Sequence, residues 1–285
     1  MPRAFVTGAG GALGSQLVEL LDREGHEVIA PSSSEVDVRD ASALAAAVAG
    51  SAPELVFHLA GTRAGGPCAL AETNVVGFAN LADALAGSSA RVVVAGSSAQ
   101  YGLRETTEPL TEDEPQRPEG WYGATKAAQE TLARTTARDG VLDTVCVRLF
   151  NLVGARQRAG LLPADLALQL VGAAPDSLVA RHLVGVRDFV DHADAARALL
   201  TVAQLGERGA VYNVAGGRAV SLRELAETLL ELDGRGVPLV DLGEFDPERS
   251  AVNQVGDASR LEGLGWHPEV DLRTSLASLL ASVSA

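Results

Sequence analysis

The feature that most constrains the fold is a glycine-rich segment, TGAGGALG, between an apolar strand pattern and a helical pattern. Residues 3–7 form a short apolar run, and residues 13–23 carry apolar side chains at helical spacing. Gly8, Gly11 and Gly14 therefore lie where a strand turns into a helix. Glycines there permit a tight turn, let a pyrophosphate approach the backbone and leave the positive end of the helix open. The segment predicts a dinucleotide site.

The same alternation continues along the first half of the chain. Strand patterns and Ala-rich helical patterns follow one another as far as about residue 150, where shorter pieces rich in Gly, Pro and Arg begin. Alternating strands and helices predict an α/β fold with a Rossmann-like, doubly wound parallel sheet. We expect further strands at 27–30, 54–59, 91–95 and 144–149, and helices at 41–49, 71–86 and 122–138.

The change of pattern near residue 150 predicts two lobes that pack against each other. Residues 1–150 would form the dinucleotide-binding domain, and residues 151–285 a smaller C-terminal α/β substrate lobe. Residues 187–204 would pack back on the first domain. In the smaller lobe, Ser221 followed three residues later by Glu224 predicts a helix start with a capping box.

Charge and cysteine content exclude other classes of protein. The net charge of −14 would repel a phosphate backbone, so we expect no nucleic-acid partner. Cys68 and Cys146 have the spacing of neither a disulfide framework nor a zinc site, and no other motif suggests a metal. No signal-peptide pattern and no run of about 18 apolar residues occurs. These features predict a cytoplasmic protein with no membrane contact and no metal.

The end of the second expected strand bears on the choice between NAD and NADP. A carboxylate that binds the adenosine ribose usually stands there, but this chain has the run PSSS. No arginine stands in the same place to bind a 2′-phosphate. The hydroxyls of Ser32 and Ser33 would nevertheless tolerate that phosphate better than a carboxylate would. The sequence leaves both cofactors open, with a slight preference for NADP.

A tyrosine and the chain's only lysine supply the candidate chemistry. Lys126 lies four residues after Tyr122 in a helical pattern, so both side chains share one face of the helix. A nearby cation lowers the pKa of a tyrosine, which can then exchange a proton beside a transferred hydride. Ser97, just after the strand pattern at 91–95, could hydrogen-bond the reacting oxygen.

Further motifs occur in an order that resembles one family. TGAGGALG is followed by DVRD, VFHLAG, NVVG, SSAQYG, YGATK, RLFNLVG, RDFVDHADAARAL and VYNVAGG, which together span nearly the whole chain. This series resembles the extended short-chain dehydrogenases/reductases, the NAD(P)-dependent epimerases, dehydratases and reductases of nucleotide-diphosphate sugars. The resemblance implies that Ser97, Tyr122 and Lys126 form a catalytic triad.

The resemblance also implies which residues bind the cofactor and the substrate. Cofactor contacts would come from Gly8, Gly11, Ala12, Leu13, Gly14, Ser32, Asp37, Val38, Leu59, Ala60 and Asn74, besides Tyr122 and Lys126. The substrate would be bound by Ser98, Asn151, Arg187 and Arg249. An arginine suits a nucleotide diphosphate because its planar fork pairs bidentately with phosphate oxygens.

Departures from the family pattern narrow the reaction. The 4,6-dehydratases place an Asp-Glu pair directly after the catalytic hydroxyl residue, where this chain has Ser98 and Ala99, so dehydration is disfavoured. Residues 149–169 and 184–199 are most similar to those of the GDP-4-keto-6-deoxymannose reductases, whereas the triad is equally similar to that of the UDP-galactose 4-epimerases. We expect a C4 reductase of a 4-keto-6-deoxyhexose that releases its cofactor, with a C4 epimerase that retains NAD as the alternative.

Two further expectations concern partners. A non-catalytic sensor of NAD(P) is the alternative from another functional class, and the presence of both Tyr122 and Lys126 disfavours it. In the family, the Ala-rich helix that carries these residues pairs across a dimer interface. The resemblance therefore implies a homodimer.

Overall fold

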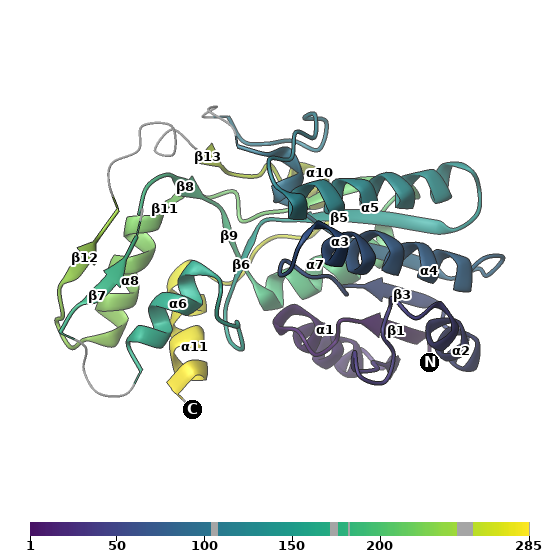
Figure 1. Ribbon diagram of the computed structural model, residues 1–285, viewed down its shortest axis with the longest axis horizontal. Coiled ribbons are helices and arrows are strands. Elements are labelled where there is room, and N and C mark those ends of the chain that lie inside the picture. Colours follow the sequence, from purple (N-terminus) through teal and green to yellow (C-terminus); the bar gives the residue numbers. More distant parts are fainter. Residues whose placement is uncertain (104–107, 172–175, 182, 244–252, 285) are drawn as a thin grey trace.

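The computed structural model describes residues 1–103, 108–171, 176–181, 183–243 and 253–284, which form two lobes of unequal size (Figure 1). The larger lobe contains a parallel sheet of six strands in the order β10-β5-β4-β3-β1-β2. The strands are β1 (Arg3–Thr7), β2 (Glu27–Ile29), β3 (Leu55–His58), β4 (Arg91–Ser97), β5 (Asp143–Leu149) and β10 (Val211–Val214). The predicted Rossmann-like α/β fold is confirmed.

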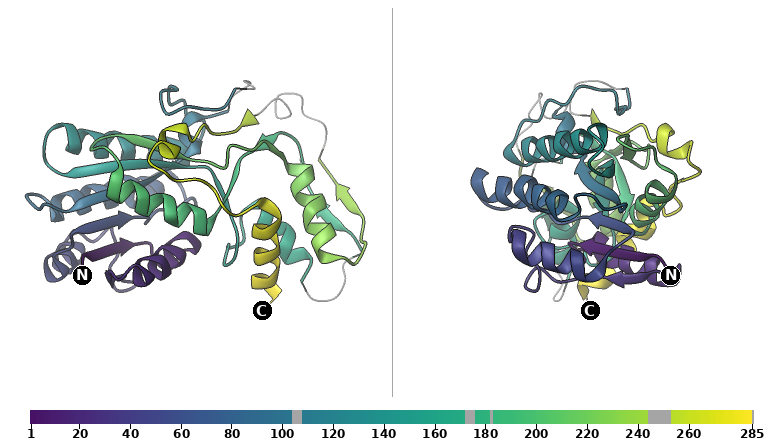
Figure 2. Two further views of the ribbon diagram at one scale, coloured as in Figure 1. Left: turned by 180° about the vertical axis from the view of Figure 1, so that it is seen from behind. Right: turned by 90° about the vertical axis from the view of Figure 1, so that its right-hand side faces the viewer.

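Helices cover both faces of this sheet (Figure 2). On one face lie α1 (Ala12–Arg23) and α7 (His192–Leu205), and on the other α2 (Ala41–Ser51), α4 (Gly77–Ala84) and α5 (Trp121–Arg138). Ala4 and Val6 of β1 pack into the first core, whereas Phe5 packs into the second. Because successive strand side chains point to opposite faces, a strand buried on both faces is continuously apolar, as residues 3–7 are.

The segment expected as one helix at 71–86 is three short elements. A helix α3 (Pro67–Ala71) leads into a π-helical turn, η1 (Glu72–Val76), and α4 follows. π-Turns occur often at functional sites because the extra residue re-aims side chains. Here the turn contains Asn74, whose side chain is fully buried.

The larger lobe also contains chain from beyond residue 150. α7 packs on α1, and β10 adds a parallel strand beside β5, whereas residues 187–191, expected to pack there as well, belong to the smaller lobe. The turn of helix α10 (Ser259–Glu262) and Trp266 complete the same core. The boundary expected at residue 150 therefore omits part of the larger lobe, because β10 buries Val211 and Val214 against that sheet.

The smaller lobe is built from short strands and three helices. Its strands pair as β7 (Leu178–Ala180) with β12 (Leu239–Asp241), β6 (Asn151–Val153) with β9 (Phe189–Asp191), and β8 (Val186–Arg187) between β11 (Val220–Ser221) and β13 (Asn253–Gln254). Its helices are α6 (Leu162–Gln169), α8 (Leu222–Asp233) and α11 (Leu272–Ser284). The hydroxyl of Ser221 accepts a hydrogen bond from the amide of Glu224 at 3.0 Å, as the predicted helix start requires.

The strand order places a crevice where a ligand can bind. β1 connects outward to β2 on one side, whereas β3, β4 and β5 follow on the other, so the chain reverses direction between β1 and β3. Ligands of doubly wound sheets bind at the carboxyl ends of the strands beside such a point. Within the described ranges, no helix is both long and apolar enough to cross a membrane.

Candidate active site

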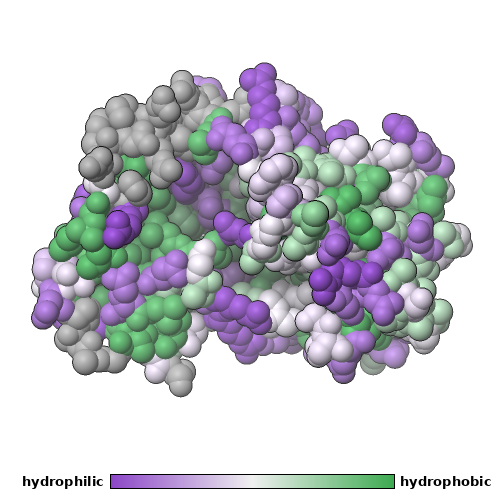
Figure 3. Space-filling model, in the orientation of Figure 1, coloured by the Kyte–Doolittle hydropathy of each residue, from purple (hydrophilic) through white to green (hydrophobic). Residues whose placement is uncertain are grey.

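Three adjoining pockets follow the carboxyl ends of the strands into the junction of the two lobes. The outer pocket, about 690 Å³, runs from the glycine turn to the segment after β2. The middle pocket, about 660 Å³, runs from the same turn to Tyr122 and Lys126, and the lobe pocket, about 520 Å³, runs from Tyr122 to Arg187. Neighbouring pockets share lining residues, so they form one groove. The space-filling view shows this face hollowed between the lobes (Figure 3).

The glycine turn between β1 and α1 allows close approach of a phosphate. Gly8 has a positive φ of 75°, and a Cβ there would lie 2.7 Å from the amide nitrogen of Ala60. A Cβ on Gly14 would lie 2.7 Å from the Cα of Ala9, so α1 can pack this closely only with glycine. Gly11 lines both the outer and the middle pocket. These are the three roles that glycines have in dinucleotide-binding turns.

The first turn of α1 offers its backbone to an anion. Gly11 is the N-cap of α1 and provides no side-chain cap, whereas Asp40 caps α2 and Asp191 caps α7 with hydrogen bonds to backbone amides. Ala12 and Leu13, at the uncapped end, line the middle pocket. Free amides and the positive end of the helix dipole suit a phosphate, so the turn fits the pyrophosphate of a dinucleotide.

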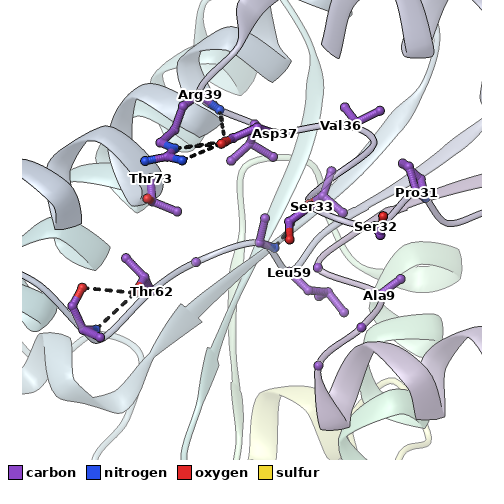
Figure 4. A pocket seen from close by; sticks show the side chains of 18 of the residues that line it. Ala9, Pro31, Ser32, Ser33, Val36, Asp37, Arg39, Leu59, Thr62 and Thr73 are labelled. Carbon is purple, nitrogen blue, oxygen red and sulfur yellow. Dashed lines mark hydrogen bonds and ion pairs between the residues drawn. The ribbon is translucent and has the colours of Figure 1, made fainter. Parts of the chain in front are cut away.

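Polar side chains from the segment after β2 line the outer pocket (Figure 4). The hydroxyl of Ser32 contacts a carboxylate oxygen of Glu35 at 2.7 Å, and Ser33 lies beside it. The carboxylate of Asp37 accepts hydrogen bonds from the guanidinium of Arg39, with a shortest distance of 2.6 Å. This arginine holds the pKa of Asp37 below its usual range.

Arg39 corrects one expectation about this pocket. No arginine was expected beside the serines, because none stands directly at the end of β2. The loop after β2 nevertheless folds back, so that Arg39 lines the same pocket as Ser32 and Ser33. Val38 lines it as well, and its side chain packs against Gly77, where no larger residue would fit.

Backbone from β3 forms the floor between the outer and middle pockets. The amide of Leu59 donates to the carbonyl of Thr7 at 3.1 Å, and the amide of Ala60 to the hydroxyl of Thr7 at 3.2 Å. Leu59 lines both pockets and Ala60 the outer one. Both residues are therefore fixed at the point where β1 and β3 diverge.

Asn74 lies behind the groove and does not line it. Its amide oxygen accepts from the backbone amide of Thr62 at 2.8 Å, and its amide nitrogen donates to the carbonyl of Thr62 and the hydroxyl of Thr125, both at 3.0 Å. These bonds occupy a fully buried side chain, so Asn74 positions the turn after β3. Its expected contact with the cofactor stays a prediction.

Ser97, Tyr122 and Lys126 come together across β4 and α5. Ser97 ends β4 and caps the 3-10 turn η2 (Ser98–Tyr101), and it hydrogen-bonds the half-buried Tyr122 in the first turn of α5. One turn later, the buried ammonium of Lys126 donates to the carbonyl of Ala95 at 2.8 Å and to the amide oxygen of Gln129 at 3.0 Å. Tyr122 lines both the middle and the lobe pocket.

The electrostatic control of Tyr122 differs from the expectation. Burial raises the pKa of Tyr122, while the hydrogen bond from Ser97 and the cation of Arg63 lower it. The guanidinium carbon of Arg63 lies 5.4 Å from the centre of the tyrosine ring. Lys126 was expected to lower this pKa, but its ammonium is bonded to Ala95 and Gln129, and burial lowers its own pKa to about 8.

Two arginines in the groove were missed by the sequence analysis. Arg63 lines the middle and lobe pockets, and Arg158 lines the outer and middle pockets. Arg63 follows β3 in the segment GTRAGG, where no motif distinguishes a groove residue from a surface one. Arg158 comes from the smaller lobe, so only the folded chain brings it to the glycine turn.

The lobe pocket gathers three of the four predicted substrate residues. Ser98, Asn151 and Arg187 all line it. The side-chain amide of Asn151 donates to the carbonyl of Asp188 at 2.9 Å, and the guanidinium of Arg187 donates to the carbonyl of Val186 at 2.9 Å. Burial lowers the pKa of Arg187.

The fourth predicted substrate residue, Arg249, lies outside the described residues. Other residues of the lobe pocket were not expected, among them Gln157, Phe189, Leu222 and Gln254. They come from four separate segments of the chain, and no short motif links them.

Two buried histidines lie close to the groove. Burial lowers the pKa of His58 to about 3 and that of His192 to about 4, so both are neutral near pH 7. A ring nitrogen of His58 is 3.0 Å from the hydroxyl of Thr7, and the side chain is fully buried, so His58 is part of the core. In the part of the chain that the structure describes, no group of three or more His, Cys, Asp or Glu side chains could hold a metal ion.

Comparison with known proteins agrees with this geometry. The NAD dependent epimerase/dehydratase family matches residues 4–215. GDP-6-deoxy-D-mannose reductase from Pseudomonas aeruginosa is 30% identical over 246 residues, which cover 80% of each chain.

Solved structures match almost the entire chain. The structure of RMD from Pseudomonas aeruginosa complexed with NADPH has a TM-score of 0.89 at 28% identity and covers 100% of this chain and 99% of that one. The Thermus thermophilus UDP-glucose 4-epimerase complex with NAD has a TM-score of 0.88 at 25% identity, with 99% and 98% covered.

These matches extend over both lobes, and the family's relatives are nucleotide-sugar reductases, epimerases and dehydratases. The resemblance seen in the sequence motifs is confirmed. The chain belongs to the NAD dependent epimerase/dehydratase family and is an NAD(P)-dependent enzyme of the extended short-chain dehydrogenase/reductase type.

Proposed function

We propose that this enzyme reduces the C4 ketone of a nucleotide-diphosphate 4-keto-6-deoxyhexose and then releases the oxidised cofactor. The observation that carries the proposal is the position of Tyr122, which lines both the middle and the lobe pocket. A proton donor at that junction can serve a reaction between a cofactor on one side and a sugar on the other.

The dinucleotide would occupy the outer and middle pockets. Its adenosine would lie among Ser32, Ser33, Asp37 and Val38, and its pyrophosphate at the glycine turn. The nicotinamide end would reach the middle pocket, where Lys126 can hold the ribose hydroxyls. When bound, the cofactor supplies a hydride to the substrate carbon. The serine hydroxyls favour NADP(H) over NAD(H), because they tolerate a 2′-phosphate better than a carboxylate would.

The sugar nucleotide would occupy the lobe pocket. Arg187 and Asn151 would bind the nucleotide diphosphate, because a guanidinium and an amide both donate hydrogen bonds to phosphate oxygens. This placement directs the sugar toward Ser97, Ser98 and Tyr122 at the opposite end of the pocket.

Proton transfer would then use the chain's own groups. Tyr122 donates the phenolic proton to the oxygen at C4 as the carbon receives the hydride, so the ketone becomes a hydroxyl. Ser97 hydrogen-bonds Tyr122 in the free site, and with substrate bound its single O–H would donate to the same C4 oxygen instead, so that both hydroxyls converge on it. Tyr122 then regains a proton from solvent that enters the open groove, and the Ser97 hydroxyl and the Arg63 cation stabilise its phenolate until it does.

Other reactions of the family are less well supported by this site. Ser98 and Ala99 follow Ser97, so the acid and base that a 4,6-dehydration needs are missing from these positions. The first relative reported above is a GDP-6-deoxy-D-mannose reductase. A C4 epimerase that retains NAD is the second candidate, supported by the similarity to UDP-glucose 4-epimerase.

The test is an analysis of cofactor content followed by turnover. Freshly purified protein is denatured, the released cofactor is identified by mass spectrometry, and the empty protein is titrated with NADPH and NADH. Oxidation of NAD(P)H on addition of a GDP-linked 4-keto-6-deoxyhexose, with the C4 alcohol as product, would support the reductase. Stoichiometric retained NAD with conversion of UDP-glucose to UDP-galactose would instead support the epimerase. An absence of response to every cofactor would contradict both.

We also propose that the enzyme is a cytoplasmic homodimer that pairs through α5. Trp121 and Leu132 of this helix are exposed apolar residues, with 66% and 37% of their surface accessible. Burial of such residues between two copies would remove apolar surface from water. Sedimentation at micromolar concentration should give about twice the monomer mass of 29.4 kDa, and a species of monomer mass alone would contradict the dimer.

A further inference from the structure

One cation of the smaller lobe lies against the glycine turn of the larger lobe. A terminal guanidinium nitrogen of Arg158 donates a hydrogen bond to the carbonyl of Gly10 at 3.0 Å, across 148 positions of sequence. Arg158 lines both the outer and the middle pocket. The lining residues common to these two pockets are Gly8, Gly11, Leu59, Gly61, Thr62, Ala64 and Arg158, and Arg158 is the one charged residue among them.

The loop that carries Arg158 is tied to both lobes two residues earlier. The guanidinium of Arg156 forms an ion pair with Glu19 of α1 at 2.8 Å, and its backbone amide donates to the hydroxyl of Ser282 of α11 at 3.1 Å. Arg156 also has a positive φ of 63°, a conformation that side-chain-bearing residues rarely adopt. Such a conformation persists where the surrounding contacts hold it. The loop is therefore positioned over the turn by specific contacts.

Most of the hydrogen-bonding capacity of Arg158 is open to a ligand. In the described part of the chain, its one hydrogen bond goes to a neutral carbonyl, and it forms no ion pair with a carboxylate. A guanidinium has five N–H donors, so four remain. By contrast, Arg39 of the outer pocket is paired with Asp37, and Arg156 with Glu19.

We propose that Arg158 binds the pyrophosphate of the dinucleotide from the edge of the glycine turn, where its guanidinium contacts Gly10. This inference rests on the proposed placement of the cofactor, because the pyrophosphate would lie where the outer and middle pockets meet. The backbone of the turn and the first turn of α1 contact one side of the phosphates. Arg158 adds a contact from the edge of the turn, since a guanidinium can bind two phosphate oxygens at once.

The proposal gives the smaller lobe a role in holding the cofactor. The same lobe supplies Asn151 and Arg187 to the lobe pocket. Cofactor that bridges the turn and Arg158 therefore fixes the loop between β6 and α6 next to the substrate site. Exchange of the cofactor requires that this bridge be broken.

The test compares cofactor affinities of three variants and the wild type, measured by calorimetry on cofactor-free protein. We expect Arg158→Ala to weaken NADPH and NADH binding about tenfold, because a hydrogen-bonded charge pair is lost. Arg158→Lys should recover part of the loss, since it keeps the charge but not the planar fork. Arg138→Ala is the matched control, because Arg138 is an exposed arginine at the end of α5 and pairs with Asp139.

Every outcome bears on the proposal. A tenfold loss in Arg158→Ala that shrinks as salt is added, with unchanged Arg138→Ala and an unchanged unfolding midpoint of the free protein, would support it. Unchanged affinity in Arg158→Ala, or an equal loss in Arg138→Ala, would overturn it and leave the proposed reductase intact. A wild type that binds neither NADPH nor NADH would instead overturn the cofactor placement itself.

Discussion

The groove has two parts that are lined differently. The cofactor half consists of the outer and middle pockets, and the substrate half is the lobe pocket. Where the outer and middle pockets meet, they are lined mainly by the glycine turn between β1 and α1 and by the segment that follows β3. The lobe pocket is built from side chains on short strands and loops of both lobes. A ligand can approach the backbone only where glycine leaves out a side chain. In the lobe pocket, by contrast, binding depends on which side chains are present. Substitutions should therefore act on the two halves in opposite ways.

Tyr122 belongs to both halves, so its loss should have the largest effect. Tyr122→Phe removes the proton donor and keeps the ring, and we expect kcat to fall about 10²- to 10⁴-fold. The Kd for NADPH should stay unchanged, because the hydroxyl is not needed to hold the pyrophosphate. Steady-state kinetics and calorimetry on one preparation measure both quantities. Unchanged turnover would revive the interpretation of this chain as a sensor of NAD(P).

A side chain added at the glycine turn should lower both the stability of the protein and its affinity for the cofactor. In Gly14→Ala, the new Cβ would lie 2.7 Å from the Cα of Ala9, and such overpacking costs about 1–3 kcal/mol of unfolding free energy. Because the turn must shift, cofactor affinity should fall as well. Gly10→Ala is the matched control, since its Cβ would meet no atom within 4 Å. Urea unfolding that shows equal stability for the two variants would contradict this account of the turn.

Tyr122 and the glycine turn, which these substitutions change, belong to the parts of the molecule that the sequence predicts well. The strands of the larger sheet are visible because burial on both faces makes them continuously apolar. The glycine turn is visible because backbone geometry restricts residue choice at Gly8 and Gly14. The spacing of Tyr122 and Lys126 is visible because it lies within one helix.

The parts that sequence reasoning missed depend on contacts between distant segments. β10 joins the sheet beside β5 after about sixty intervening residues of the smaller lobe and α7, and the periodicity of its four residues does not identify β5 as its partner, although they begin the motif VYNVAGG. Arg158 reaches Gly10 only through the packing of the two lobes. The π-turn directs the amide of Asn74 to Thr62, a contact that no sequence motif predicted. Such placements follow from tertiary packing, which local periodicity does not encode.

In the substrate half, removal of a side chain should weaken binding of the sugar nucleotide. We expect Arg187→Ala to raise the KM for the sugar nucleotide about tenfold or more, because hydrogen bonds to a charged group are lost. Cofactor affinity should not change, since Arg187 lines only the lobe pocket among the three. Arg223→Ala is the control, because that arginine is exposed and lies 3.7 Å from Asp241. A matching loss of NADPH affinity in Arg187→Ala would show that the two halves are not separable.

The smallest effect is expected at Arg63, which lines the middle and the lobe pocket. This arginine changes the pKa of Tyr122 rather than the affinity for a ligand. Its cation lowers the pKa of Tyr122, so Arg63→Leu should raise that pKa. The sign then depends on the direction of reaction. Ketone reduction needs the protonated phenol, so the pH above which kcat/KM declines should move to higher values. Alcohol oxidation needs the phenolate, so the pH at which kcat/KM rises should move in the same direction.

The measurement is a pH profile of kcat/KM in both directions for wild type, Arg63→Leu and Arg63→Lys. The unfolding free energy should change by less than about 1 kcal/mol, because an exposed cation–π contact contributes no more than that. Arg63→Lys keeps a cation near the ring and should lie closer to the wild type. If both limbs stay in place in Arg63→Leu, the proton at the junction is governed by burial and Ser97, and the two halves meet only at Tyr122 itself.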